Sequence, residues 1–203
     1  MSKVTFARIR NGVRRRLLSL LQDSSASEFL ASRYFPQQET CQIPDMWFLL
    51  EQTFGQVTAG TYVEVGGFDG LYASNSWGLA IRGWRGVLIE PVPEFADQAR
   101  RNYRDFPNVT IINHAIADSS TEEIEVRIAG PLTTGHTPTS DQYERTNWAT
   151  SSLTKSSKKV PARTLDDTLD DAGIKTDFEV LIIDVEGMEE SVFSGFSLHR
   201  WKP

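Results

Sequence analysis

The 203-residue sequence predicts an α/β fold in which a mostly parallel sheet is covered by helices on both faces. Short runs that are almost wholly apolar alternate with segments of helical periodicity, and strands buried inside a parallel sheet have this composition. The first apolar run, residues 61–65, is followed at once by Gly66, Gly67 and Gly70. Such an abrupt end is typical of a strand that gives way to a tight turn close to a ligand.

Four apolar runs are the expected strands of this sheet, and the last of them is the most apolar. They cover residues 61–65, 86–90, 109–112 and 180–183. Residues 123–129 alternate between apolar and polar side chains, which predicts an edge or accessory strand. Residues 160–163 are expected to return to the sheet.

Helical periodicity and helix-end signals place helices between these strands. The expected helices are Trp47 to Phe54 after an N-cap at Asp45, Ser74 to Arg82 before Gly83, one that starts at Pro93 and passes Phe95, Ala99 and Tyr103, one from Thr164 to Ala172 before Gly173, and one after Gly187.

The first 44 residues differ in charge from the rest of the chain. Six basic residues precede the first acid, Asp23, whereas the net charge of the whole chain is −6. Residues 1–22 predict a basic amphipathic helix that contacts a membrane surface or a partner, or packs on its own domain. The acidic remainder argues against nucleic acid binding. We expect residues 1–44 to form this helix and a linker, and residues 45–203 to form the functional domain.

Other bulk features narrow the class of protein. The single cysteine, Cys41, permits neither an internal disulfide nor a cysteine metal site. No apolar run approaches a membrane span, so we expect a cytoplasmic protein. Residues 130–159 are rich in Thr, Ser, Gly and Pro, and a polar excursion of this size is either disordered or functional. Within it, His136 is either a catalytic base or a solvated loop residue.

The second strand ends in Glu90, an acid that lies beside the glycine turn in the predicted sheet. An acid in this place commonly holds the two hydroxyls of a ribose. A dinucleotide turn would have glycines at positions 66, 68 and 71, but Phe68 and Leu71 occupy the last two. The spacing of Glu64, Gly66 and Gly70 instead favours a nucleoside without phosphates, such as S-adenosylmethionine. The alternative is a strand, turn and helix without a ligand.

A group of carboxylates follows the last apolar strand. Because ligands of open α/β sheets lie beyond the carboxyl ends of the strands, residues 66–70, 113–117 and 184–186 should share one rim with Glu90. In an extended segment Asp184 and Glu186 would project to the same side, with Glu189 one turn further on. These acids could serve catalysis, cap the following helix, or hold a hard metal ion through oxygen ligands.

Taken together, the motifs resemble those of the FkbM family of S-adenosylmethionine-dependent methyltransferases, which have a class I Rossmann-like fold. The matching segments occur in family order and cover about residues 60–195. They are Tyr62–Gly70, Ser74–Ser76, Gly86–Pro91, Ala115–Asp118, Ser151–Leu153, Thr164–Asp167 and Ile183–Gly187.

This resemblance implies O-methylation of a sugar or natural-product hydroxyl, and it assigns roles to the matching residues. Asp184 would be the catalytic base, with Glu186 as the second candidate. No metal is expected. The residues expected to bind the cofactor are Gly66 and Gly70 around its methionine part, Glu90 at the ribose, Ala115 and Ile116 beside the adenine, and Glu64, Gly67, Asp69 and Asn75 within the matched motifs.

Members of this family continue well beyond the equivalent of residues 201–203. The resemblance therefore implies that the later strands of the class I sheet are missing from this chain. The strand at 180–183, expected to be an interior strand, would then keep one unpaired edge, and an exposed apolar edge favours self-association into a homo-oligomer. Two other function classes stay open: an inactive, truncated binding module of the same fold, and an NAD-dependent oxidoreductase, which the glycine pattern disfavours.

Overall fold

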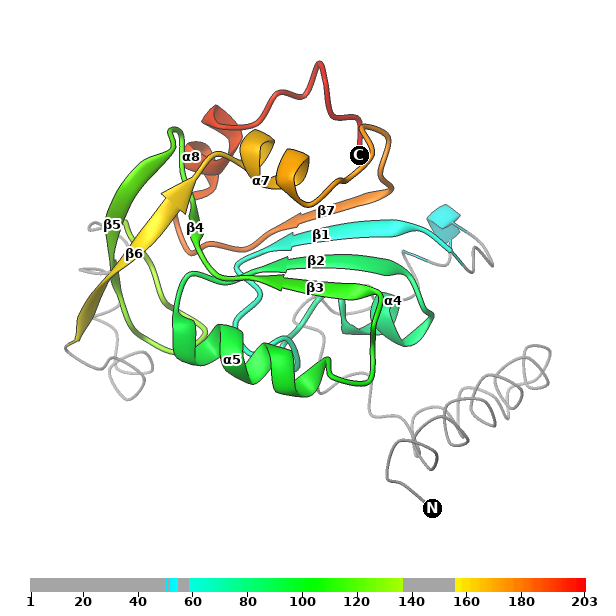
Figure 1. The fold of residues 1–203 in the computed structure, drawn as a ribbon, viewed down its shortest axis with the longest axis horizontal. Coiled ribbons are helices and arrows are strands. Elements are labelled where there is room, and N and C mark those ends of the chain that lie inside the picture. Colours follow the sequence, from blue (N-terminus) through cyan, green and yellow to red (C-terminus); the bar gives the residue numbers. More distant parts are fainter. Residues whose placement is uncertain (1–49, 51, 55–58, 137–155) are drawn as a thin grey trace.

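The computed structural model describes residues 50, 52–54, 59–136 and 156–203 (Figure 1). Its centre is a four-stranded parallel sheet of β1 (Thr61–Val65), β2 (Arg85–Ile89), β3 (Val109–Ile112) and β7 (Val180–Ile183) in the order β3-β2-β1-β7. From β1 the chain continues to β2 and β3 on one side, and it reaches β7 on the other side much later. The strand order therefore reverses at β1, and this is where open α/β sheets bind ligands.

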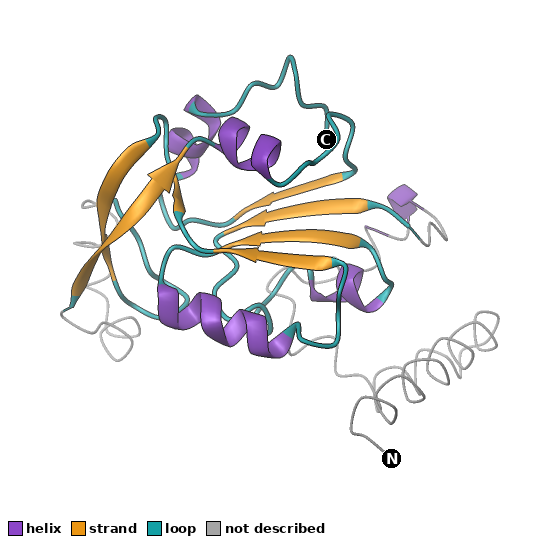
Figure 2. Cartoon of the chain, viewed as in Figure 1, coloured by secondary structure: helices purple, strands orange, loops and turns teal. Residues whose placement is uncertain are grey.

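Alternation along β1 divides the core between the two faces of the sheet. Val63 and Val65 join the apolar cluster on the face that carries α7 (Leu165–Asp171) and α8 (Glu189–Ser194). Tyr62 joins the cluster on the opposite face, which carries α4 (Trp77–Ile81) and α5 (Pro93–Asn102). Figure 2 shows one helix layer on each side of the parallel strands. The predicted α/β fold, with a mostly parallel sheet and helices on both faces, is confirmed.

Local sequence signals explain where these helices begin and end. The Thr164 side chain accepts a hydrogen bond from the Asp167 amide and caps α7. Gly83 and Gly173 follow α4 and α7 with φ of 84° and 60°, as the predicted helix stops require. In α5 the basic side chains Arg100 and Arg101 face solvent, while Ala99 is buried.

A second, three-stranded sheet lies beyond the carboxyl ends of the first and consists of β4 (Ala115–Ile116), β6 (Ser157–Arg163) and β5 (Thr121–Arg127) in that order. The accessory strand predicted at 123–129 is therefore confirmed as β5. The expectation that residues 160–163 return to the main sheet is wrong, because β6 pairs with β4 and β5 instead. Only alternate residues of β6, Val160 and Ala162, are fully buried, and a strand buried on one face suits a small sheet better than a parallel interior.

The structure describes the two ends of the polar excursion predicted at 130–159, and both ends contain residues that pair with strands. Residues 157–159 belong to β6, and the segment after Gly130 returns along β5 through an antiparallel bridge between Arg127 and Thr134. Residues 137–155 lie outside the described chain, as do the basic segment 1–22 and the Asp45 cap. Of the helix expected at 47–54, residues 50 and 52–54 are described and are helical.

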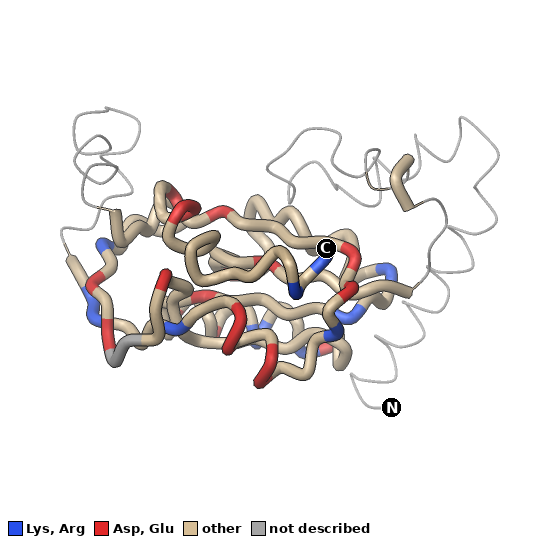
Figure 3. Tube along the Cα trace, turned by 90° about the horizontal axis from the view of Figure 1, so that it is seen from above, with Lys and Arg blue, Asp and Glu red and all other residues tan. Residues whose placement is uncertain are grey.

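Strand β7 has a partner on one side only, since within the described residues it pairs with β1 and with no other strand. All four of its residues are half-buried, although their composition predicted an interior strand. No helix of the described chain is long and apolar enough to cross a membrane. Acidic and basic positions are interspersed along the described chain (Figure 3).

Candidate active site

The glycine turn after β1 brings the ends of three strands together. The Gly66 and Gly67 amides both donate to the carbonyl of Ile89, the last residue of β2, at 2.9 and 3.1 Å. Gly66 has φ of 89°, and a Cβ there would lie 1.8 Å from the Asp184 carbonyl oxygen at the end of β7. No side chain fits in that space, so Gly66 allows β1 and β7 to approach at the switch point.

The Glu90 carboxyl group binds the backbone of this turn on the side of the pocket. One carboxyl oxygen accepts the Phe68 amide at 2.9 Å and the other accepts the Val92 amide at 2.8 Å. The side chain is 4% exposed, and burial raises its pKa to about 8. Phe68 has φ of 46°, which is uncommon for a residue with a side chain. The carboxyl group therefore fixes a strained residue of the turn.

Glu64 lies on the opposite side of the turn, on the face of the sheet that carries α4. Its carboxyl group accepts hydrogen bonds from the Ser76 hydroxyl and the Asn75 amide. Burial raises its pKa to about 7. Glu64 therefore ties the central strand to the segment that leads into α4.

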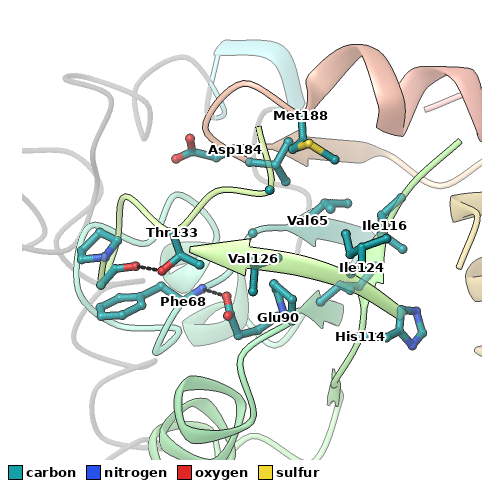
Figure 4. A pocket seen from close by; sticks show the side chains of 18 residues that line it. Val65, Phe68, Glu90, His114, Ile116, Ile124, Val126, Thr133, Asp184 and Met188 are labelled. Atoms are coloured by element: carbon teal, nitrogen blue, oxygen red, sulfur yellow. Dashed lines mark hydrogen bonds between the residues drawn. The ribbon is translucent and has the colours of Figure 1, made fainter. Parts of the chain in front are cut away.

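A pocket opens in front of the turn, between the ends of the parallel strands and the second sheet. It surrounds about 570 Å³ of empty space, including its mouth onto solvent. Figure 4 shows Glu90 and Asp184 entering it from different strand ends, with aliphatic side chains between them. The lining comprises Val65, Gly66, Phe68, Ile89, Glu90, Pro91, His114, Ala115, Ile116, Ile124, Val126, Gly130, Pro131, Thr133, Gly135, Asp184, Val185 and Met188.

The ionisable groups in the described lining of this pocket are two carboxyl groups and one histidine. The two carboxyl groups belong to Glu90 and Asp184, and no described lining residue is Lys or Arg. His114 is half-buried with Nε2 at 2.9 Å from the Thr168 hydroxyl, and burial lowers its pKa to about 4. At neutral pH the imidazole is therefore uncharged, and the described wall carries no positive charge to meet a phosphate.

The turn after β7 departs from the predicted geometry. Glu186 has φ of 52° and lies in a turn, so the extended backbone assumed for Asp184 and Glu186 is wrong. Asp184 lines the pocket, whereas Glu186 is not among the lining residues. Burial, followed by the nearby Glu189 carboxylate, raises the pKa of Asp184.

Glu189 binds backbone amides just before α8, as one of the alternatives for these acids required, but it does not cap the helix, whose N-cap residue is Met188. Its carboxyl oxygen accepts the Val185 and Gly187 amides at 3.4 and 3.2 Å at the start of α8. Within the described residues, no three His, Cys, Asp or Glu side chains form a group that could hold a metal ion.

The structure thus brings some of the predicted site residues together at one pocket and leaves others behind it. Gly66, Glu90, Ala115, Ile116 and Asp184 line the pocket. The remaining predicted residues support the turn and its surroundings. Gly67 packs against Leu88, and Gly70, with φ of 72°, packs against the Tyr103 ring. Asp69 accepts the Leu71 and Tyr72 amides, Asn75 is buried beside Glu64, and Glu186 lies in the turn after Asp184.

Sequence reasoning missed the wall that the second sheet contributes. Ile124 and Val126 of β5 line the pocket, as do residues of the segment 130–135 and Met188 before α8. The apolar alternation of β5 was a visible signal that one of its faces is buried. That signal did not say against which part of the chain the face packs.

Comparison with known proteins relates the chain to a family. Searches of curated proteins and of solved structures gave no significant match. A family model described as the methyltransferase FkbM domain matches residues 64–203, which include β1 from Glu64 onward and every later strand and helix of the described fold. The chain therefore belongs to the FkbM methyltransferase domain family.

Proposed function

We propose that this protein is an S-adenosylmethionine-dependent methyltransferase that acts on a hydroxyl group of a sugar or natural product. The observation that carries the proposal is the absence of Lys and Arg from the described lining of the pocket. The pocket lies at the switch point of the sheet, and its described lining has two carboxyl groups. S-adenosylmethionine carries a sulfonium and an ammonium group, whereas NAD carries a pyrophosphate, which favours basic side chains or a free helix N-terminus.

The residues present fit an adenosine derivative. Each oxygen of Glu90 accepts one backbone amide. With a pKa of about 8 the carboxyl group is largely protonated at neutral pH, so it has one O–H donor and further acceptor positions. Positions therefore remain on both oxygens for the two ribose hydroxyls. Ile89 and Ile116 supply apolar walls of the kind that an adenine ring requires.

Asp184 is the proposed general base. When bound, S-adenosylmethionine supplies an electrophilic methyl group, so the chain has to orient an acceptor hydroxyl and remove its proton. Burial raises the pKa of Asp184 and makes it a stronger proton acceptor than an exposed aspartate. The aliphatic side chains from β5 would limit water beside it.

Isothermal titration of the full chain with S-adenosylhomocysteine and with NAD tests the cofactor. We expect binding of S-adenosylhomocysteine and no heat of binding with NAD, because the described wall offers no positive charge to the pyrophosphate of NAD. Affinity for NAD without any response to S-adenosylhomocysteine would end the methyltransferase proposal in favour of an oxidoreductase. Binding of both ligands would show that pocket charge does not select the cofactor.

A further inference from the structure

A buried threonine links the second sheet to the turn that carries the proposed base. Thr134 is 3% exposed, and its hydroxyl donates to the backbone carbonyl of Glu186 at 2.7 Å. The same oxygen accepts the His136 amide at 2.9 Å. A side chain at this place must therefore donate and accept at once, which a hydroxyl can do.

The backbone of Thr134 is fixed on the second sheet. Its amide and carbonyl both pair with Arg127 of β5, at 3.2 and 2.8 Å. Beside it, Gly135 lies close to Met188, since a Cβ at Gly135 would be 3.5 Å from the methionine sulfur. The segment 133–135 is thus a rigid extension of β5 that reaches the start of α8.

The turn on the other side of this hydrogen bond is strained and is held from several directions. Glu186, with φ of 52°, is its strained residue. The Asp184 amide donates to Val65 of β1, and Glu189 accepts two amides of the turn. A left-handed residue other than glycine is strained, and it persists where its surroundings determine it. The hydroxyl of Thr134 is part of those surroundings.

We propose that Thr134 is a positioning residue, whose hydroxyl holds Glu186 in its left-handed conformation and thereby fixes the Asp184 side chain at the pocket. The second sheet covers the pocket, and the segment that carries Thr134 pairs with it. The hydrogen bond from Thr134 therefore links the cover of the pocket to the turn that carries Asp184. The role assigned to Asp184 rests on the proposed function. The link between the second sheet and the turn does not.

The test is backbone amide hydrogen exchange of the full, ligand-free chain in three variants. Thr134→Val keeps the shape and removes the hydroxyl, whereas Thr134→Ser keeps the hydroxyl. Thr133→Val is the matched control, because the Thr133 hydroxyl donates to Gly130 and accepts the Ala129 amide inside its own hairpin.

Thr134→Val should raise exchange in residues 184–188 by about five- to tenfold relative to β1 and β2, as expected for the loss of one buried hydrogen bond. Thr134→Ser should match the wild type, and Thr133→Val should loosen only its own hairpin. If Thr134→Val does not fold, Thr134→Ala is measured at lower temperature with the same expectation.

Unchanged exchange at 184–188 without the hydroxyl would overturn the proposal. So would an equal rise in Thr134→Ser, which would assign the effect to the methyl group, or a uniform rise through β1 and β2, which would make Thr134 merely a contributor to global stability. Because these measurements use no ligand, a failure to bind S-adenosylhomocysteine would end the proposed function and leave this inference standing.

Discussion

Glu64 and Glu90 lie on opposite sides of the same glycine turn, and they differ mainly in their partners. Both are almost fully buried, at 3% and 4% exposure, and burial raises both pKa values, to about 7 and about 8. Glu64 accepts hydrogen bonds from the Ser76 hydroxyl and the Asn75 amide behind the turn. Glu90 accepts two backbone amides at the pocket wall.

This comparison teaches that a motif residue can serve a binding site without touching the ligand. Both acids belong to segments that resemble the family motifs, and sequence alone predicts cofactor contact for both. Only Glu90 has a carboxyl group at the pocket. We therefore expect the fold to depend most on Glu64 and the affinity for the nucleoside to depend most on Glu90.

The largest expected effect is on stability, in Glu64→Ala. The change leaves two buried donors without this acceptor, and each such loss costs about 1–3 kcal/mol. We expect the free energy of unfolding in urea to fall by about 2–4 kcal/mol, with much less change in Glu64→Gln, which keeps an acceptor oxygen. A stable Glu64→Ala protein that has lost affinity for S-adenosylhomocysteine would instead make Glu64 a ligand.

The next effect is on affinity, in Glu90→Ala. Above its pKa of about 8 Glu90 is ionised, and hydrogen bonds to charged groups contribute about 1.5–3 kcal/mol. In that pH range the dissociation constant for S-adenosylhomocysteine should rise roughly tenfold to more than a hundredfold. Titration calorimetry at a temperature where the variant is folded measures this. Unchanged affinity in a folded variant would show that Glu90 does not bind the nucleoside and that, like Glu64, it only supports the turn.

The remaining prediction concerns the pH dependence of stability. Both acids have pKa values raised from 4.5 on folding, to about 7 and about 8, so the native state binds more protons than the unfolded state between these limits. Their contribution to stability is complete below pH 4.5 and is lost as pH rises through about 7 and 8. Urea unfolding at several pH values should show a shallower decline in Glu64→Gln and Glu90→Gln than in the wild type. Parallel curves would contradict the raised pKa values.

The main sheet was predictable because each of its strands carries its own signal. The apolar runs, the three glycines and the acid after β2 are all local features, and pairing the strands in parallel brings their carboxyl ends together. The approach of Gly66 to the Asp184 carbonyl follows from the same pairing.

Other features depend on contacts between distant segments and could not be read from local pattern. The left-handed conformation of Glu186 is one, since nothing in an Asp-Val-Glu-Gly sequence distinguishes a turn from an extended end. The pairing of β6 with β4 and β5 is another, because the partner of a half-buried strand is decided by the rest of the fold. The role of Thr134 could not be predicted from the sequence, because no local pattern distinguishes it from the other threonines of residues 130–159.

The one-sided pairing of β7 has a consequence for motion. Within the described chain β1 has a neighbour on each side, whereas β7 is held by β1 alone and is only half-buried. Strands with fewer hydrogen bonds and less buried surface open locally at lower free energy than the centre of a sheet. Both edge strands of the main sheet, β3 and β7, are therefore expected to open locally at lower free energy than β1 and β2. Because β7 leads to the turn that carries Asp184, the hydrogen bonds that hold this turn from β1 and from Thr134 compensate for the missing neighbour.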